Sequence, residues 1–124
     1  LAAAALSLMG AGDLSSAGLV ISSLEKRGSS PVVSFLRGEF YYQGADFSLA
    51  EAKYQEAAAA ESGFWPALYR AGSLAEGGNA TRYRYRLKKA LESMEKGAGC
   101  GYEVFIGGFS PDYYRRILEK KLAL

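Results

Sequence analysis

Residues 38–57 read GEFYYQGADFSLAEAKYQEA, and this stretch decides what fold we expect. Its small and aromatic positions are Gly38, Tyr41, Ala50, Tyr54 and Ala57. From Ala50 onward these positions recur at intervals of four and three residues, which places them on one face of a helix. Small residues let two antiparallel helices approach closely, and aromatic side chains fill the space beside them. The stretch therefore predicts a helical hairpin with its turn near Gly44.

The same pattern recurs along the chain with a period of 33 residues. Four sets of positions share this period, the last of them within one residue: Ala17, Ala50 and Tyr83; Ile21, Tyr54 and Leu87; Leu24, Ala57 and Ala90; and Gly12, Gly44 and Gly78. A fixed period of this length is typical of stacked helical repeats. We therefore predict an all-α solenoid of about three repeats (1–30, 31–64 and 65–96), followed by a Gly-rich connector and a C-terminal capping helix in 97–124.

The predicted helices begin where proline or a capping residue stands and end near glycines. They span 1–9, 13–27, 31–43, 46–61, 65–77, 80–96 and 111–122. In the last helix Ser110 is the expected N-cap, and Asp112 complements the positive end of the helix dipole. An apolar stripe follows, made of Tyr114, Ile117, Leu118 and Leu122. The stripe predicts that this helix folds back as a cap on the last repeat; the alternative is that it occupies a binding groove.

Composition limits the functions that the chain can have. The 124 residues include 49% hydrophobic residues, 15 basic and 13 acidic residues, no His and one Cys. Catalytic triads and metal sites that need His are therefore excluded, and the lone Cys100 fits a reducing, cytoplasmic compartment. No apolar run is long enough to span a membrane. The chain begins at Leu1 with an Ala-rich segment that lacks a preceding basic region, so we expect a repeat helix from a longer protein and not a signal peptide.

Two segments resemble functional motifs but are better explained structurally. Residues 82–89, RYRYRLKK, combine basic and aromatic residues, but helical spacing gives a solvated basic stripe that includes Arg82, Arg86 and Lys89. Residues 97–101, GAGCG, lack the strand and the Lys-Ser/Thr pair of a phosphate loop. We therefore predict no catalytic residue, no metal, no cofactor and no nucleic-acid site in this chain.

Residues 31–64 resemble the tetratricopeptide repeat (TPR) family at its small and aromatic positions. Arg37 and Ser62 depart from the family pattern, as does Tyr83 in the third unit. The resemblance implies a concave groove lined by the first helix of each pair. Its candidate residues are Phe35, Glu39, Tyr42, Gln43, Tyr69, Ser73 and Glu76. Their chemistry suits a peptide or helix of a protein partner, although the three aromatic residues equally fit packing between repeats.

Longer stretches resemble the repeats that follow the catalytic domain in some CheR-type chemotaxis methyltransferases. These stretches are FYYQG (40–44), AKYQEA (52–57), GFWPALYRAG (63–72), YRLKKALE (85–92) and FIGGFSPDYYRRILE (105–119). The resemblance implies that the parent protein transfers a methyl group from S-adenosylmethionine to receptor glutamates, through a domain outside this chain. This segment would then dock to a chemoreceptor or another signalling protein. The alternative is a TPR adaptor of a secretion or pilus-assembly system.

Overall fold

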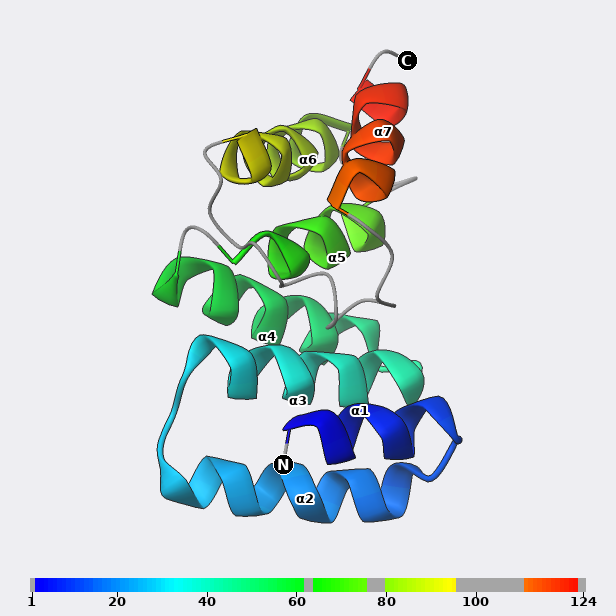
Figure 1. Cartoon of the computed structure of the whole chain (residues 1–124), viewed down its shortest axis with the longest axis vertical. Coiled ribbons are helices and arrows are strands. Elements are labelled where there is room, and N and C mark those ends of the chain that lie inside the picture. Colours follow the sequence, from blue (N-terminus) through cyan, green and yellow to red (C-terminus); the bar gives the residue numbers. More distant parts are fainter. Residues whose placement is uncertain (1, 62–63, 76–79, 96–110, 123–124) are drawn as a thin grey trace. The chain divides into compact units, whose positions relative to one another are not determined.

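The computed structural model describes residues 2–61, 64–75, 80–95 and 111–122, and every regular element in these ranges is an α-helix (Figure 1). The helices are α1 (Ala2–Gly10), α2 (Leu14–Arg27), α3 (Pro31–Gln43), α4 (Phe47–Ala60), α5 (Trp65–Ala75), α6 (Ala80–Glu95) and α7 (Pro111–Leu122). All seven predicted helices are present, with ends that agree to within two residues. The expected all-α class is confirmed for these ranges. Within them, no helix combines the length and apolar character that a membrane crossing requires.

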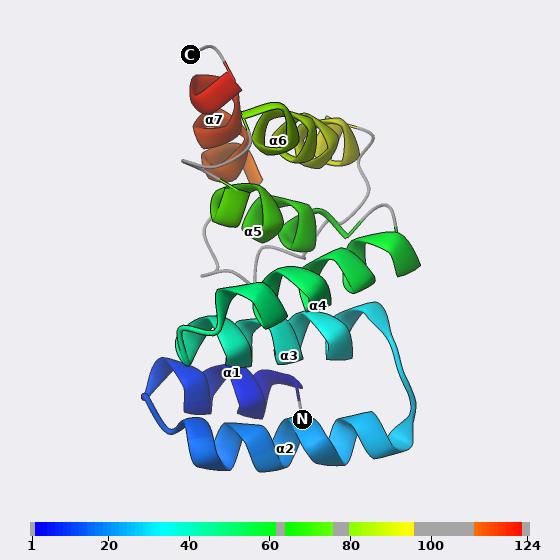
Figure 2. The ribbon, with the colours of Figure 1, turned by 180° about the vertical axis from the view of Figure 1, so that it is seen from behind.

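The chain divides into two compact units, Leu1–Ala60 and Glu61–Leu124. In unit 1, α3 contacts α1, α2 and α4, and consecutive helices run in opposite directions (Figures 1 and 2). In unit 2, α6 contacts both α5 and α7. Each expected repeat range thus contains one pair of helices, and α7 is the additional helix of unit 2.

The α1–α2 turn and the α3–α4 turn of unit 1 have the same hydrogen bonds. The backbone amide of Asp13 donates to a carbonyl five residues earlier at 2.8 Å, and the amide of Asp46 makes the same bond at 2.9 Å. Each aspartate then accepts a hydrogen bond from the amide three residues ahead, at 3.1 and 3.4 Å, and so caps the next helix. The preceding residues, Gly12 and Ala45, have positive φ angles of 81° and 62°. The sequence aligned Gly44 with Gly12, but Gly44 has φ −83°, and Ala45 takes the left-handed position.

Three of the four sets that share the 33-residue period lie at or near the core, whereas Gly12 and Gly44 of the fourth set are exposed. The buried members of the three sets are Ala17, Ala50, Ile21, Tyr54, Leu87, Ala57 and Ala90. Leu24 is half-buried, while Gly78 and the side chain of Tyr83 lie outside the described residues. In those three sets the repeat in the sequence is therefore a repeat of core positions.

A glycine brings the two helices of each central hairpin close together. A Cβ atom on Gly38 would lie 2.8 Å from two ring carbons of Tyr54, so the backbone of α3 at Gly38 packs directly against the Tyr54 ring of α4. A Cβ atom on Gly72 would lie 2.6 Å from Leu87 Cδ2, which brings α5 against α6 in the same way. These contacts leave space for only a hydrogen atom at either position.

Candidate functional site

The α3 candidates divide into an inner and an outer pair. Phe35 is fully buried, and its ring centroid lies 5.5 Å from that of Tyr54. Glu39 is 6% exposed, and its carboxylate accepts a hydrogen bond of 2.7 Å from the Tyr54 hydroxyl. Tyr42 is 38% exposed and packs edge-on against Phe47 with centroids 5.6 Å apart, and Gln43 is exposed. Of these four candidates, only Tyr42 and Gln43 present a surface to a partner.

Two of the three α5 candidates, Tyr69 and Ser73, lie in the described part of the chain. Tyr69 is half-buried, and the hydroxyl of Ser73 donates to its backbone carbonyl at 3.0 Å. This bond lies within one turn of α5, and Ser73 itself is half-buried. Glu76 lies outside the described residues. The structure therefore leaves Ser73 as the partly accessible polar residue of this set.

Helix α7 covers part of α5 through one tyrosine. The Tyr114 ring lies 5.4 Å from Trp65 and 5.6 Å from Tyr69, measured between centroids. Tyr114 and Leu118 are buried, in agreement with the predicted apolar stripe, and Leu122 is half-buried. Burial of side chains this large contributes on the order of 1.5–3 kcal/mol each. Tyr69 is thus a packing residue beneath α7.

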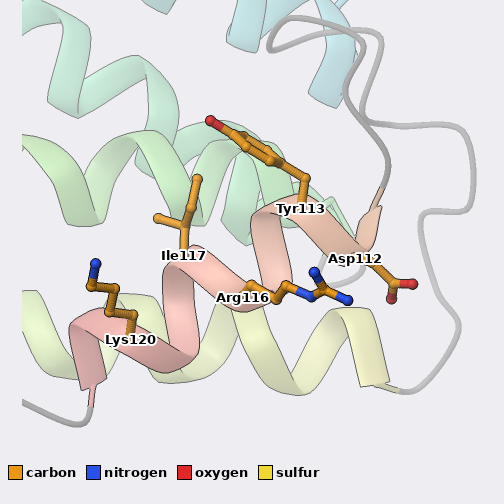
Figure 3. Close-up of a pocket in the computed structure, with 5 residues that line it drawn as sticks. All are labelled: Asp112, Tyr113, Arg116, Ile117 and Lys120. Carbon is orange, nitrogen blue, oxygen red and sulfur yellow. The ribbon is translucent and has the colours of Figure 1, made fainter.

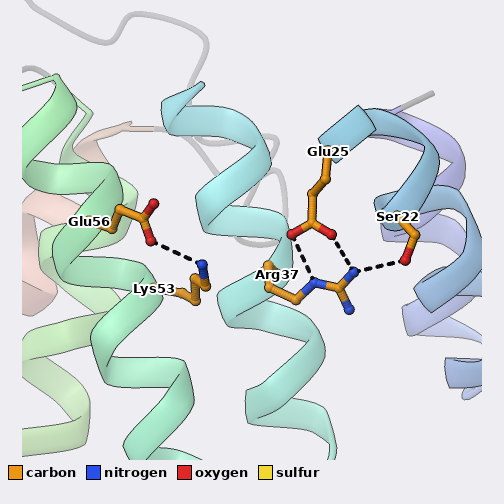
Figure 4. A network of polar contacts seen from close by, with 5 residues as sticks. All are labelled: Ser22, Glu25, Arg37, Lys53 and Glu56. Atoms are coloured by element: carbon orange, nitrogen blue, oxygen red, sulfur yellow. Dashed lines mark hydrogen bonds and ion pairs between the residues drawn. The ribbon is translucent and has the colours of Figure 1, made fainter. Parts of the chain in front are cut away.

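Arg37, one of the three residues that depart from the TPR pattern, joins α2 to α3 (Figure 4). Its guanidinium makes a two-pronged contact with Glu25, at 3.2 Å from Nε and 2.7 Å from Nη2. Nη2 also donates to the Ser22 hydroxyl at 3.1 Å, and the guanidinium carbon lies 4.9 Å from the centre of the Phe40 ring. The hydrogen bond from Arg37 lowers the pKa of the Glu25 carboxyl, partial burial opposes this shift, and the charges of Arg37 and Lys53 reinforce it.

A small hollow of about 180 Å³ lies beside this network in unit 1. It is lined by Glu25, Ser29, Val33, Ser34, Lys53 and Glu56. Lys53 pairs with Glu56 at 3.1 Å, and Glu25 pairs with Arg37, so the charged groups of the hollow already neutralise one another (Figure 4). The Glu25–Arg37 pair links α2 to α3, the Lys53–Glu56 pair lies within α4, and the four charges leave no net charge to select a ligand.

The basic face of α6 differs from the predicted stripe at one residue. Arg82, Lys88 and Lys89 are exposed, and Lys89 pairs with Glu92 at 3.6 Å. Arg86 is instead only 6% exposed, because its guanidinium donates at 3.0 Å to the Ala71 carbonyl on α5. The expectation that Arg86 faces solvent is wrong: its long side chain reaches back across the hairpin to a backbone acceptor near the end of α5.

The outer side of α7 borders a larger hollow, of about 560 Å³ (Figure 3). Its lining residues are Asp112, Tyr113, Arg116, Ile117 and Lys120. Tyr113 and Ile117 extend in the same direction from the helix, and the charged residues lie alongside them (Figure 3). Ile117, which the sequence assigned to the buried stripe, is half-buried and forms part of this wall.

Part of the motifs singled out in the sequence cannot be placed on these surfaces. Cys100, Ser110 and the connector 97–110 lie outside the described residues. Within the described ranges, no three His, Cys, Asp or Glu side chains are grouped so that they could hold a metal ion. Comparison of the chain with protein-family models, curated proteins and solved structures finds no match.

Proposed function

We propose that this chain is a protein–protein interaction module of the TPR type, in which the first helix of each pair carries the binding face. One observation supports the proposal most strongly: the 33-residue period is present both in the buried positions and in the two capped turns of unit 1. Helical repeats built in this way present extended surfaces for binding. On this proposal the partner is a peptide or a helix of another protein.

The proposed binding residues are those that the helices leave accessible. Tyr42 and Gln43 stand at the exposed end of α3, and Ser73 is partly accessible on α5. Tyrosine provides a large, rigid contact area, and an amide or a hydroxyl can hydrogen-bond to a peptide backbone. Within unit 1, Phe35 and Glu39 support the accessible residues of α3 from inside, because both contact Tyr54.

We further propose, on the resemblance of the repeat stretches alone, that the parent is a CheR-type methyltransferase that uses S-adenosylmethionine and acts on chemoreceptors in the cytoplasm. In this proposal the module brings the enzyme to a receptor or signalling protein and takes no part in methyl transfer. The gene that encodes the chain should then encode a methyltransferase domain upstream. A lipoprotein signal in that place would favour the secretion or pilus-assembly adaptor instead.

Binding of cytoplasmic chemoreceptor fragments, measured by isothermal titration calorimetry, tests the proposal. We expect saturable binding that the double variant Tyr42→Ala/Gln43→Ala weakens about tenfold, equivalent to about 1.4 kcal/mol. The matched control is Leu19→Ala, which changes an exposed apolar residue on α2. The same fragments with labelled S-adenosylmethionine should receive no methyl group from this chain. Methyl transfer, or binding that both variants leave unchanged, would overturn the proposed role of this face.

A further inference from the structure

We infer that the outer side of α7 is a second docking surface, which accepts an acidic peptide segment with one apolar anchor residue. We call it the α7 outer surface and define it by Tyr113, Arg116, Ile117 and Lys120. It does not include any of the groove candidates on α3 and α5. The inference therefore goes beyond the proposed function and can fail independently of it.

The positive charge of the α7 outer surface is not compensated by its own helix. Asp112 is the acidic residue that lines the hollow, and its carboxylate pairs with Arg115 at 3.0 Å. Arg116 and Lys120 are exposed, and no carboxylate in the described part of the chain forms an ion pair with either. Both stand one helical turn apart at the same hollow, so a ligand there meets two cations together.

The charge distribution along the chain points to the same class of ligand. Unit 1 contains four basic and six acidic residues, whereas unit 2 contains eleven basic and seven acidic residues. The net charge of the whole chain is only +2, which conceals this difference. A basic unit attracts acidic segments over several ångströms and orients them during encounter.

The apolar wall selects a peptide over a simple polyanion. Tyr113 is 46% exposed, Ile117 is half-buried, and the hollow beside them measures about 560 Å³. This space accommodates a Leu or Phe side chain, while Arg116 and Lys120 stand close enough to contact flanking Asp or Glu residues. A phosphate backbone or lipid headgroup would use the cations and leave the apolar wall unoccupied. An amphipathic acidic peptide uses both.

The inner side of α7 makes this outer surface rigid. Tyr114 and Leu118 anchor the helix in unit 2, and Tyr114 contacts two aromatic rings of α5. Tyr113 lies edge-on to Tyr114 with centroids 5.3 Å apart. A docking surface on an anchored helix loses less conformational entropy on binding than a free helix does.

The test uses the whole chain and three fluorescently labelled probes of equal length in fluorescence anisotropy. The first probe is a peptide of Asp, Glu and Ser with one central Leu, the second replaces that Leu with Ser, and the third is single-stranded RNA. The variant Arg116→Glu/Lys120→Glu removes the cations, and Tyr113→Ala opens the apolar wall. The charge-matched control is Arg82→Glu/Lys88→Glu, which reverses two exposed cations on α6.

We expect the Leu peptide to bind saturably at physiological ionic strength and about tenfold more tightly than the Ser peptide, a difference of about 1.4 kcal/mol. Arg116→Glu/Lys120→Glu should abolish this binding, Tyr113→Ala should remove the preference for Leu, and the α6 control should retain both. Equal losses in the α7 and α6 variants would show general electrostatic attraction and overturn the inference. So would the absence of binding, or tighter binding of the RNA than of the Leu peptide.

Discussion

The hairpin α3–α4 in unit 1 and the hairpin α5–α6 in unit 2 are built alike but completed differently. In both, a glycine on the first helix touches a large side chain of the second, Gly38 against Tyr54 and Gly72 against Leu87. The first hairpin is joined to the preceding one by a polar contact, from Arg37 to α2. In the second hairpin, α6 contacts α7, and Tyr114 of α7 packs against two aromatic rings of α5.

This difference shows which parts of the fold the repeat controls. The contact within a hairpin follows the period to within one residue, because Tyr54 and Leu87 are 33 residues apart and the glycines that they meet, Gly38 and Gly72, are 34 apart. What lies on the outside of a hairpin depends on residues that the period does not include, such as Arg37 and Leu118. A repeat pattern therefore predicts the hairpins well and their neighbours poorly.

The largest effect is expected where α7 completes unit 2. Leu118 is fully buried, and Leu118→Ala should lower the free energy of unfolding of unit 2 by about 3 kcal/mol through the cavity it leaves. Trp65 is the chain's single tryptophan and lies beside Tyr114, so its fluorescence during urea unfolding reports on this unit. The control Leu19→Ala removes a side chain that is 72% exposed and should change the stability by less than about 0.5 kcal/mol. Equal effects of the two variants would contradict the packing of α7.

The next effect compares the two close helix contacts. Gly38→Ala should destabilise unit 1 by about 2 kcal/mol, because the new methyl group meets a buried ring held by its bond to Glu39. Gly72→Ala meets the end of a leucine side chain, which can move, and should cost about 1 kcal/mol. Gly10→Ala, with no atom within 4 Å of its Cβ position, is the control. Far-UV circular dichroism during urea unfolding measures all three. A stabilising Gly38→Ala would show that α3 and α4 do not touch there.

A smaller effect of opposite sign is expected in the second turn of unit 1. Ala45 has a φ of 62°, a conformation that costs an L-residue about 1 kcal/mol and costs glycine little. Ala45→Gly should therefore stabilise unit 1 by about 0.5 kcal/mol, and Gly12→Ala in the first turn should destabilise it by about 1 kcal/mol. Thermal and urea unfolding of the two variants measures whether each substitution raises or lowers the stability of unit 1. The same sign for both would show that the turns are not equivalent.

The smallest effect is the pH dependence that Glu25 gives to unit 1. The pKa of this carboxyl is lowered in the folded chain, so its contribution is fully present above its unfolded pKa and is lost as the pH falls through the folded pKa. Glu25 is 39% exposed, and with solvent screening the contribution amounts to about 0.5 kcal/mol. Urea midpoints from neutral to acidic pH should fall more in the native chain than in Glu25→Gln. If the urea midpoints of the two proteins fell equally with pH, the contact of Arg37 with Glu25 would not contribute to the stability of unit 1.

The sequence predicted the helices closely because their signals are local. The proline at the start of α3 acts within one turn, and so do Asp13 and Ser30, which the structure shows to be the N-caps of α2 and α3. The candidate site was harder to predict, because exposure depends on what packs against a helix. Position in the repeat predicted that Phe35, Glu39 and Tyr42 all line the groove. In the structure the first two are buried and contact Tyr54.

The outer surface of α7 was missed for a related reason. An apolar stripe is read from helical spacing, and that spacing assigned Ile117 to the inner face with Leu118. The two residues are adjacent in sequence, and the structure buries Leu118 while leaving Ile117 at the hollow beside Tyr113. The signal that could have found this surface is the charge difference between the two halves of the chain, which the net charge of +2 conceals.

Native-state hydrogen exchange of the α7 amides tests most directly whether this helix completes unit 2 and holds its outer surface in place. If Tyr114 and Leu118 anchor α7, its central amides should exchange through the same opening as those of α5 and α6, with the same free energy and the same urea dependence. Leu118→Ala should lower the opening free energies of α5, α6 and α7 by the same amount. Exchange of the α7 amides at the rate of a free peptide, while α5 and α6 stay protected, would contradict this account.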